Sequence, residues 1–177
     1  MVTRDPMSIT RTSTTIVATF VLVAGLTQNA SAQMFIATGH DTLRGLPGVE
    51  VAVETLEPEL ERGGLTRAAI QTDVARRLGA GGVTLYGSQT ENPSAAKAYL
   101  YVQVDGLRLP GQDLYAIGVQ VQLRQTLRSP VTASNIVDAM TWDAHTLLVV
   151  KISEVVRVRE TIQEYVDQFA RDWMAVH

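Results

Sequence analysis

The stretch that decides the fold is AYLYVQVDGLRLPGQDLYAIGVQVQLRQ, residues 98–125. Apolar and polar side chains alternate over residues 98–105 and again over residues 115–124. This period of two is typical of a strand with one buried face and one face in water. Gly106 and Pro110 lie between the two halves and favour a turn. The stretch therefore predicts two strands joined by a turn.

The same alternation predicts strands on either side of this stretch. Residues 49–54 place three valines on one face, and the short segment 83–86 follows two glycines. Residues 135–142 alternate more weakly and are predicted to form a fifth, edge strand. Because only one face of each strand is apolar, we expect a mainly antiparallel sheet of four or five strands that is covered on one side only.

Two amphipathic helices are predicted to provide that cover. Residues 65–78 have apolar side chains at three- and four-residue spacing, with Thr66 as the N-cap and Gly79 as a left-handed stop. The segment from about 153 to 173 carries a longer stripe of the same kind, namely Val155, Val158, Ile162, Tyr165, Phe169 and Trp173. Helical spacing makes this stripe core rather than a cofactor site. The predicted fold class is α+β, a two-layer sandwich in the order strand, helix, three or four strands, helix.

The first 32 residues have the three parts of a secretory signal. Arg4 and Arg11 precede an apolar run over residues 16–26, and Ala30 to Ala32 offers small residues for a signal peptidase. As a helix, the run covers about 17 Å of a bilayer core of about 30 Å. We therefore expect a signal peptide cleaved before Gln33, with an uncleaved N-terminal membrane anchor as the alternative. The expected location is periplasmic, with membrane contact only through residues 1–32 if they are retained.

Length and composition fit one globular domain after this leader. The chain has 177 residues, of which 46% are hydrophobic and 19% are charged. Residues 33–47 show little periodicity and are expected to form a lead-in, followed by a single α+β domain over residues 48–177, in which 57–64 and 88–97 are predicted loops. Cysteine is absent, which excludes disulfides, thiolate metal sites, cysteine nucleophiles and an N-terminal lipid attachment through cysteine.

The charge balance argues against nucleic acid as a partner. Without residues 1–32 the chain keeps 15 − 2 = 13 basic and 18 − 1 = 17 acidic residues. Phosphate contacts dominate nucleic-acid affinity and need a dense positive field, which a mildly acidic domain lacks. The balance is compatible with a basic protein partner.

Residues suited to catalysis are scarce. The sequence contains no nucleophile elbow, phosphate-binding loop, dinucleotide fingerprint or paired-histidine zinc motif. Its histidines are His40, His145 and His177, and only His145 has a nearby partner in sequence, Asp143. Two such residues need further ligands to hold a divalent ion, so we interpret the pair as a polar turn between the last strand and the last helix. We therefore expect no enzyme activity, no metal and no cofactor.

Two sets of residues are candidates for binding a protein partner. One set lies on the polar faces of adjacent predicted strands and comprises Tyr99, Tyr101, Gln120 and Gln122. Tyrosine on an open sheet face adds amphipathic contact area at low entropic cost, although cross-strand pairing that only stabilises the sheet explains it equally well. The other set is acidic, belongs to the predicted loop after the first strand, and comprises Glu57, Glu59 and Glu61. It would attract a basic face, and its alternative role is to keep a loop solvated.

Several segments together resemble a group of uncharacterised exported bacterial α+β proteins. They are TLRGLPGVEVAVETL (42–56), GLTRAAIQTDVARRLGAGG (64–82), AYLYVQV (98–104), LYAIGVQVQLRQ (114–125), MTWD (140–143) and VRETIQEYVDQFARDW (158–173). The element order also resembles the lipopolysaccharide-assembly lipoprotein and the TolB N-terminal domain, but the chain has neither the lipobox cysteine of the first nor a propeller repeat. The resemblance implies the α+β fold and transfers no site residue.

Two functions from different classes follow as hypotheses. The first is a non-catalytic periplasmic accessory or scaffold subunit that binds a membrane-associated or envelope protein complex through its open sheet face or a sheet edge. The second is a soluble periplasmic protein that binds a small molecule lodged between the sheet and the helices, which would require a pocket of useful volume there.

Overall fold

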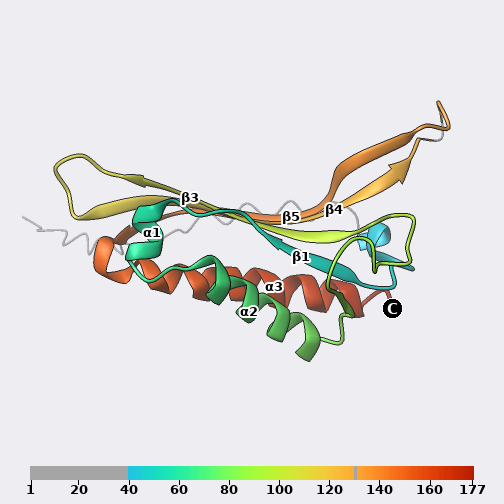
Figure 1. Ribbon diagram of the computed structural model, residues 1–177, viewed down its shortest axis with the longest axis horizontal. Helices are drawn as coiled ribbons and strands as arrows, with labels where there is room; N and C mark the ends of the chain where they lie inside the picture. The colour runs from blue at the N-terminus through green and yellow to red at the C-terminus, as the bar shows by residue number, and fades with distance from the viewer. Residues whose placement is uncertain (1–39, 130) are drawn as a thin grey trace, which may run out of the picture. The chain divides into compact units, whose positions relative to one another are not determined.

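The computed structural model describes residues 40–129 and 131–177, which lie within one compact unit, residues 32–177. A sheet forms one layer and two long helices form the other (Figure 1). The elements are the 3-10 turn η1 (His40–Leu43), β1 (Val49–Val53), α1 (Pro58–Arg62), α2 (Arg67–Ala80), β2 (Leu85–Tyr86), β3 (Tyr99–Arg108), β4 (Leu114–Arg128), β5 (Asn135–Lys151), the 3-10 turn η2 (Ile152–Arg157) and α3 (Val158–Met174). The predicted two-layer α+β sandwich is confirmed.

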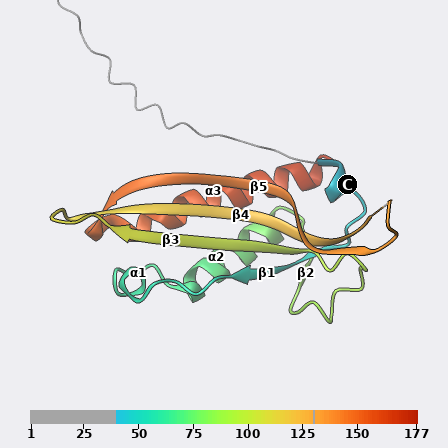
Figure 2. The same ribbon diagram turned by 90° about the horizontal axis from the view of Figure 1, so that it is seen from above.

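The sheet has five strands in the order β2-β1-β3-β4-β5 and is mixed. β1 pairs in parallel with both β2 and β3, whereas β3 with β4 and β4 with β5 are antiparallel. Parallel neighbours need a crossover, and α2 supplies it between β1 and β2. From above, α2 lies beneath β1 and α3 beneath β4, so both helices cover the same face (Figure 2).

The last strand is much longer than residues 135–142, and the predicted polar turn at Asp143 and His145 is wrong. β5 pairs with β4 from Arg128↔Asn135 to Leu114↔Lys151, so both residues lie in mid-strand. The β4–β5 hairpin projects beyond the rest of the sheet (Figure 1). At its base the register shifts between Leu123 and Arg124 and again between Gln125 and Leu127, and at the second shift Asp138 of β5 has a φ of 61°. A bulge of this kind bends the paired strands.

The helix boundaries follow the sequence with two corrections. Thr66 caps α2 as predicted, because its Oγ1 accepts a hydrogen bond from the Ala69 N–H at 3.2 Å. Gly79 does not stop the helix, which continues to Ala80, and the left-handed residue is Gly82 with a φ of 78°. The charged segment 57–64, predicted as a loop, contains the short helix α1, which Leu60 anchors in the core.

The core lies between the sheet and the helices. The helix-facing rows of β3 and β4 are buried, and they meet the buried stripe of α3, which includes Tyr165, Phe169 and Trp173 as predicted. Trp142 brings β5 into this core. Its ring lies edge-to-face against Phe169 at 5.2 Å, and its Nε1 donates to Asp172 of α3 at 2.8 Å.

An ion-pair network holds α2 against α3. Asp73 of α2 accepts hydrogen bonds at 2.8 Å from Arg159 and from Gln163, both on α3. Burial opposes ionisation of Asp73, but these hydrogen bonds and the Arg159 charge outweigh it and hold the pKa of Asp73 below its ordinary value. The network therefore favours the carboxylate in the folded state.

We expect Asp73→Asn to lower the free energy of unfolding at pH 7 by about 2 kcal/mol, because charged hydrogen bonds are lost. A lowered carboxyl pKa stabilises the fold above the unfolded-state pKa, about 3.9, and this contribution disappears as the pH falls through the folded-state pKa. Urea unfolding from pH 7 to pH 2 measures both effects. The gap between wild type and variant should shrink below about pH 4, and a gap independent of pH would contradict the assignment.

Candidate functional site

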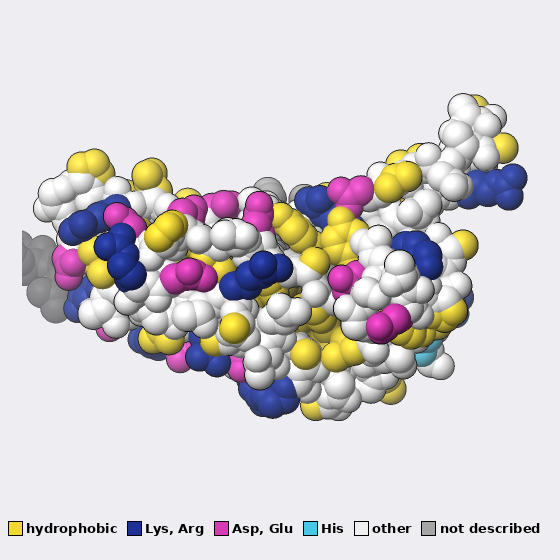
Figure 3. Space-filling model, in the orientation of Figure 1, with side chains coloured by type: hydrophobic (Ala, Val, Ile, Leu, Met, Phe, Trp, Pro, Cys, Tyr) yellow, Lys and Arg dark blue, Asp and Glu magenta, His cyan; other side chains and the backbone are white. Residues whose placement is uncertain are grey.

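The face of the sheet opposite the helices is the candidate site. Residues whose side chains alternate with the buried rows of β3 and β4 lie here, and the described helices leave it uncovered (Figures 1 and 2). The structure places Tyr99, Tyr101, Gln120 and Gln122 on this face, as the sequence predicted. Gln122 is nevertheless almost fully buried. In a side view of the sheet and the helix layer, acidic, basic and hydrophobic side chains are interspersed over the visible surface rather than gathered in a field of one sign (Figure 3).

Arg124 of β4 organises the polar centre of this face. Its guanidinium carbon lies 4.5 Å from the centre of the Tyr101 ring, a cation–π contact. The same guanidinium donates to Gln122 Oε1 at 2.9 and 3.0 Å and to Asp138 Oδ2 at 3.0 Å. Asp138 lies at the irregular part of β5 and has a left-handed backbone. No local sequence pattern indicated this cluster, since its members meet only through sheet register.

Both tyrosine hydroxyls on this face already have intramolecular partners. Tyr99 donates to Asp138, and Tyr101 donates to Glu54. Burial, followed by the Glu54 carboxylate, raises the pKa of Tyr101 to about 12, and burial together with Asp138 raises the pKa of Tyr99. Their hydroxyls are therefore protonated donors used within the sheet, which supports cross-strand stabilisation as one role of these residues.

The end of this face nearest the β3–β4 turn is apolar. Leu107, Ala116 and Val149 form one cross-strand row, and Leu147 lies beside Gly118 in the next row. Leu107, Leu147 and Val149 are 67%, 73% and 61% exposed. Nothing lies within 4 Å of the position that a Cβ atom on Gly118 would take. We name Leu107, Ala116, Leu147 and Val149 the apolar end.

Asp143 and His145 lie on the open face between the polar centre and the apolar end. His145 Nδ1 is 2.6 Å from Asp143 Oδ2, and the two residues stand opposite Gln122 and Gln120 on β4. The structure therefore joins the predicted pair, although on a strand. Among residues 40–129 and 131–177, no group of three or more histidine or acidic side chains is arranged to hold a metal ion.

The acidic candidates lie apart from the tyrosines. Glu57 precedes α1, and its Oε1 accepts from the Gly106 N–H at 3.4 Å. Glu59 accepts from the Tyr115 hydroxyl at 2.6 Å, on the helix side of the sheet. Glu61 is exposed on α1. Glu57 and Glu59 fasten α1 to the end of the sheet, so the structure does not unite the acidic residues with the open face into one site.

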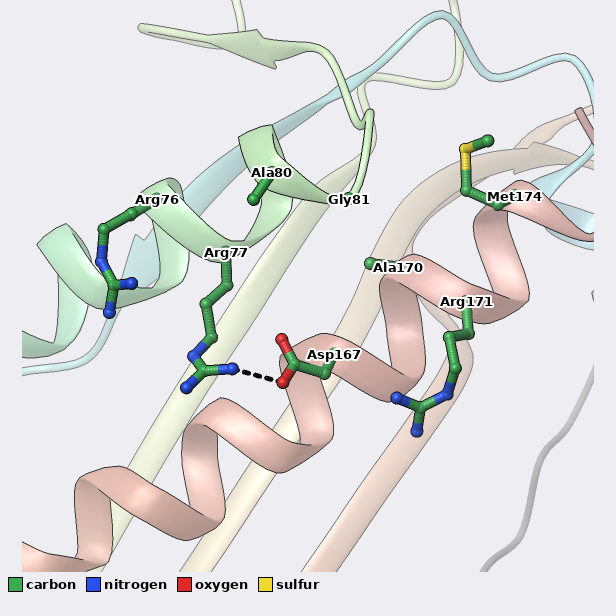
Figure 4. A pocket seen from close by; sticks show the side chains of 8 residues that line it. All are labelled: Arg76, Arg77, Ala80, Gly81, Asp167, Ala170, Arg171 and Met174. Carbon is green, nitrogen blue, oxygen red and sulfur yellow. Dashed lines mark hydrogen bonds and ion pairs between the residues drawn. The ribbon is translucent and has the colours of Figure 1, made fainter.

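A depression lies on the helix layer, between the C-terminal halves of α2 and α3. It measures about 560 Å³ and is lined partly by Arg76, Arg77, Asp167 and Arg171. The Arg77 guanidinium is directed at Asp167 and paired with it, while Arg76 and Arg171 extend elsewhere (Figure 4). Both helices end here, and helix C-termini disfavour anions. The arginines therefore do not form a convergent anion site.

Comparisons with known proteins place the chain in no family. No family model matches it, and no curated protein does. Among solved structures it is similar to a variant of the PelC dodecamer from Paraburkholderia phytofirmans, with 15% identity and a TM-score of 0.41 over 72% of this chain and 87% of that chain. A second PelC dodecamer from the same organism gives 17% identity and a TM-score of 0.40 over 68% and 85% of the two chains. Likenesses this loose carry no functional inference.

None of the helices in the described ranges is long and apolar enough to cross a membrane. The predicted signal or anchor, residues 1–32, and most of the predicted lead-in lie outside the described residues. Export therefore stays a prediction, as do the expected resemblances.

Proposed function

We propose that the protein is a non-catalytic accessory or scaffold subunit that binds a membrane-associated or envelope protein complex through the open face of its sheet. The observation that carries the proposal is the apolar end, where Leu107, Leu147 and Val149 stand more than half exposed. Exposed apolar side chains gathered on one face, beside a polar rim, are typical of protein contact surfaces. The Arg124 cluster supplies that rim.

The pattern of contacts favours a protein partner over a small molecule. The small-molecule hypothesis required a pocket between the sheet and the helices. One depression lies between α2 and α3, away from the sheet, and the groove between the β5 edge and the start of α3 opens at the surface. Small ligands are usually held in concave sites that bury most of their surface. An open sheet face suits a macromolecular partner better.

Leu107→Glu is expected to weaken partner binding by at least tenfold, because a buried, unpaired carboxylate would replace an apolar contact. Leu107 lies on β3 and is 67% exposed, so the fold should tolerate the change. A photo-reactive residue placed at position 107 in producing cells should give a discrete heavier adduct, and a second one at exposed Gln71 on α2 should not. Equal adducts at both positions, or none at position 107, would refute the proposed surface.

A further inference from the structure

The outer edge of β5 is a second recognition feature. β5 is the last strand of the sheet, and η1 bonds to it at Thr141, whose carbonyl accepts from Thr42 Oγ1 at 3.4 Å. From Asp143 to Lys151 no described strand pairs with this edge. Proteins usually protect an edge with charges, prolines or bulges. Here the middle of the free segment carries the exposed Leu147 and Val149, and its charges lie at the two ends, Asp143 and Lys151.

Strand alternation indicates which backbone groups face outward. The Ile152 N–H donates to the Asp113 carbonyl at 3.2 Å, one step beyond the pair Leu114↔Lys151. Hydrogen-bonded and non-bonded pairs alternate in an antiparallel ladder. The even-numbered residues, such as Val150, are thus bonded to β4. The odd-numbered residues from 143 to 151 direct their N–H and C=O groups to the free edge.

We propose that β5 pairs in an antiparallel manner with β5 of a second copy of this chain, about a two-fold axis at Leu147. An isologous interface must be complementary to itself, and this segment is. With the axis at Leu147, Asp143 lies opposite Lys151 of the second copy and His145 opposite Val149, and each relation occurs twice. The two sheets become one, with all helices on the same side.

Charge selects this register over its neighbours. Moving the axis to Thr146 would place Lys151 opposite Thr141, and moving it to Leu148 would place Lys151 opposite His145. Neither register brings opposite charges together, whereas cross-strand pairs of opposite charge stabilise antiparallel sheets. The axis at Leu147 also centres the pairing on the stretch that η1 leaves free.

The polar atoms at the two ends of this segment lack partners within one chain. Asp143 Oδ2 contacts His145, but Asp143 Oδ1 is buried with no hydrogen-bond partner among the described residues. Lys151 is exposed and forms no ion pair in the part of the chain that the structure describes. A buried carboxylate oxygen without a partner is destabilising, and the ammonium of a second copy would satisfy it.

Apolar contacts would add to the backbone pairing. A groove of about 460 Å³ runs between the β5 edge and the start of α3, lined partly by Leu148, Val150 and Val158. In the proposed register, Leu148 and Val150 lie beside Thr146 and Ala144 of the second copy. These smaller residues fit along the rim of the groove, and Leu147 would meet its own counterpart on the open face.

A disulfide trap tests the register, because the natural chain contains no cysteine. In purified Leu147→Cys, the two Cys side chains would lie directly opposite each other, at a Cα separation of about 5.5 Å that a disulfide can span. Under mild oxidation we expect covalent dimers to form at least tenfold faster than in the matched control Val149→Cys. A mixture of His145→Cys and Val149→Cys chains should cross-link almost as fast as Leu147→Cys.

A second measurement does not depend on cysteine. Lys151→Asp would place two aspartates opposite each other at both ends of the interface, so its dimer dissociation constant by analytical ultracentrifugation should rise at least tenfold over wild type. Equal cross-linking rates at positions 147 and 149 would overturn the proposal. So would a wild-type chain that stays monomeric at every concentration up to about 1 mM. Neither result bears on Leu107, so failure here is distinguishable from failure of the proposed function.

Discussion

Trp142→Ala is expected to lower the free energy of unfolding by about 4 kcal/mol, the largest effect of any substitution considered. Trp142 is 0% exposed, and it joins β5 to α3 through an edge-to-face contact with Phe169 and a hydrogen bond to Asp172 at 2.8 Å. Removing the indole creates a cavity that the surrounding strand and helix cannot close. It also removes the hydrogen-bond donor of Asp172. Urea unfolding followed by circular dichroism measures the change.

Trp142→Phe is the matched control. It keeps an aromatic ring against Phe169 but removes the Nε1 donor to Asp172, so it should be destabilised by about half as much as the alanine variant. Trp173 remains as a fluorescent reporter in both variants. Should the two variants lose the same stability, the hydrogen bond to Asp172 rather than the packed ring would hold β5 to the helix layer.

Local pattern was enough to predict most of the fold. The alternation over residues 98–125 predicted β3 and β4, and the 3.6-residue spacing predicted α2 and α3, because each element buries one face against the other layer. Thr66 was identifiable as a cap from its position alone, and the structure confirms it. These features depend on residues close together in sequence, so they can be predicted from one sequence.

Features set by distant partners were missed. The second half of β5 contains Leu147 to Val150, a continuous apolar run without alternation, so its strand state depends on pairing with β4. Gly79 was predicted as a helix stop, but the helix continues one residue beyond it and the left-handed turn falls on Gly82. Boundaries of this kind are decided by packing against another element rather than by the local residue type.

The candidate site was predicted in part for the same reason. Tyr99 and Tyr101 were placed correctly on the open face, since strand alternation fixes which side a residue takes. Their partners, Asp138 and Glu54, lie 39 and 47 residues away in sequence and could not be inferred without the register. The apolar end was invisible because two of its members, Leu147 and Val149, belong to the unpredicted half of β5.

Gly81→Val is expected to destabilise the protein by about 3 kcal/mol through overpacking between the two helices of the cover. A Cβ atom built on Gly81 lies 2.5 Å from the Ala170 Cβ, closer than real Cβ contacts allow, so α2 and α3 must separate. Neither atom can rotate away, because both are fixed to their backbones. Thermal unfolding measured by circular dichroism should show a large fall in Tm for this variant.

A glycine two residues earlier, Gly79, provides the comparison. A Cβ atom on Gly79 meets nothing within 4 Å, and Gly79 lies inside α2, so Gly79→Ala should stabilise the protein by about 0.5–1 kcal/mol through helix propensity. The two substitutions change the stability in opposite directions only if α3 packs closely against the end of α2 at Gly81. If Gly81→Val were neutral, the close approach of the helices at Ala170 would be refuted, and with it the tight cover that leaves the opposite face of the sheet as the free surface for recognition.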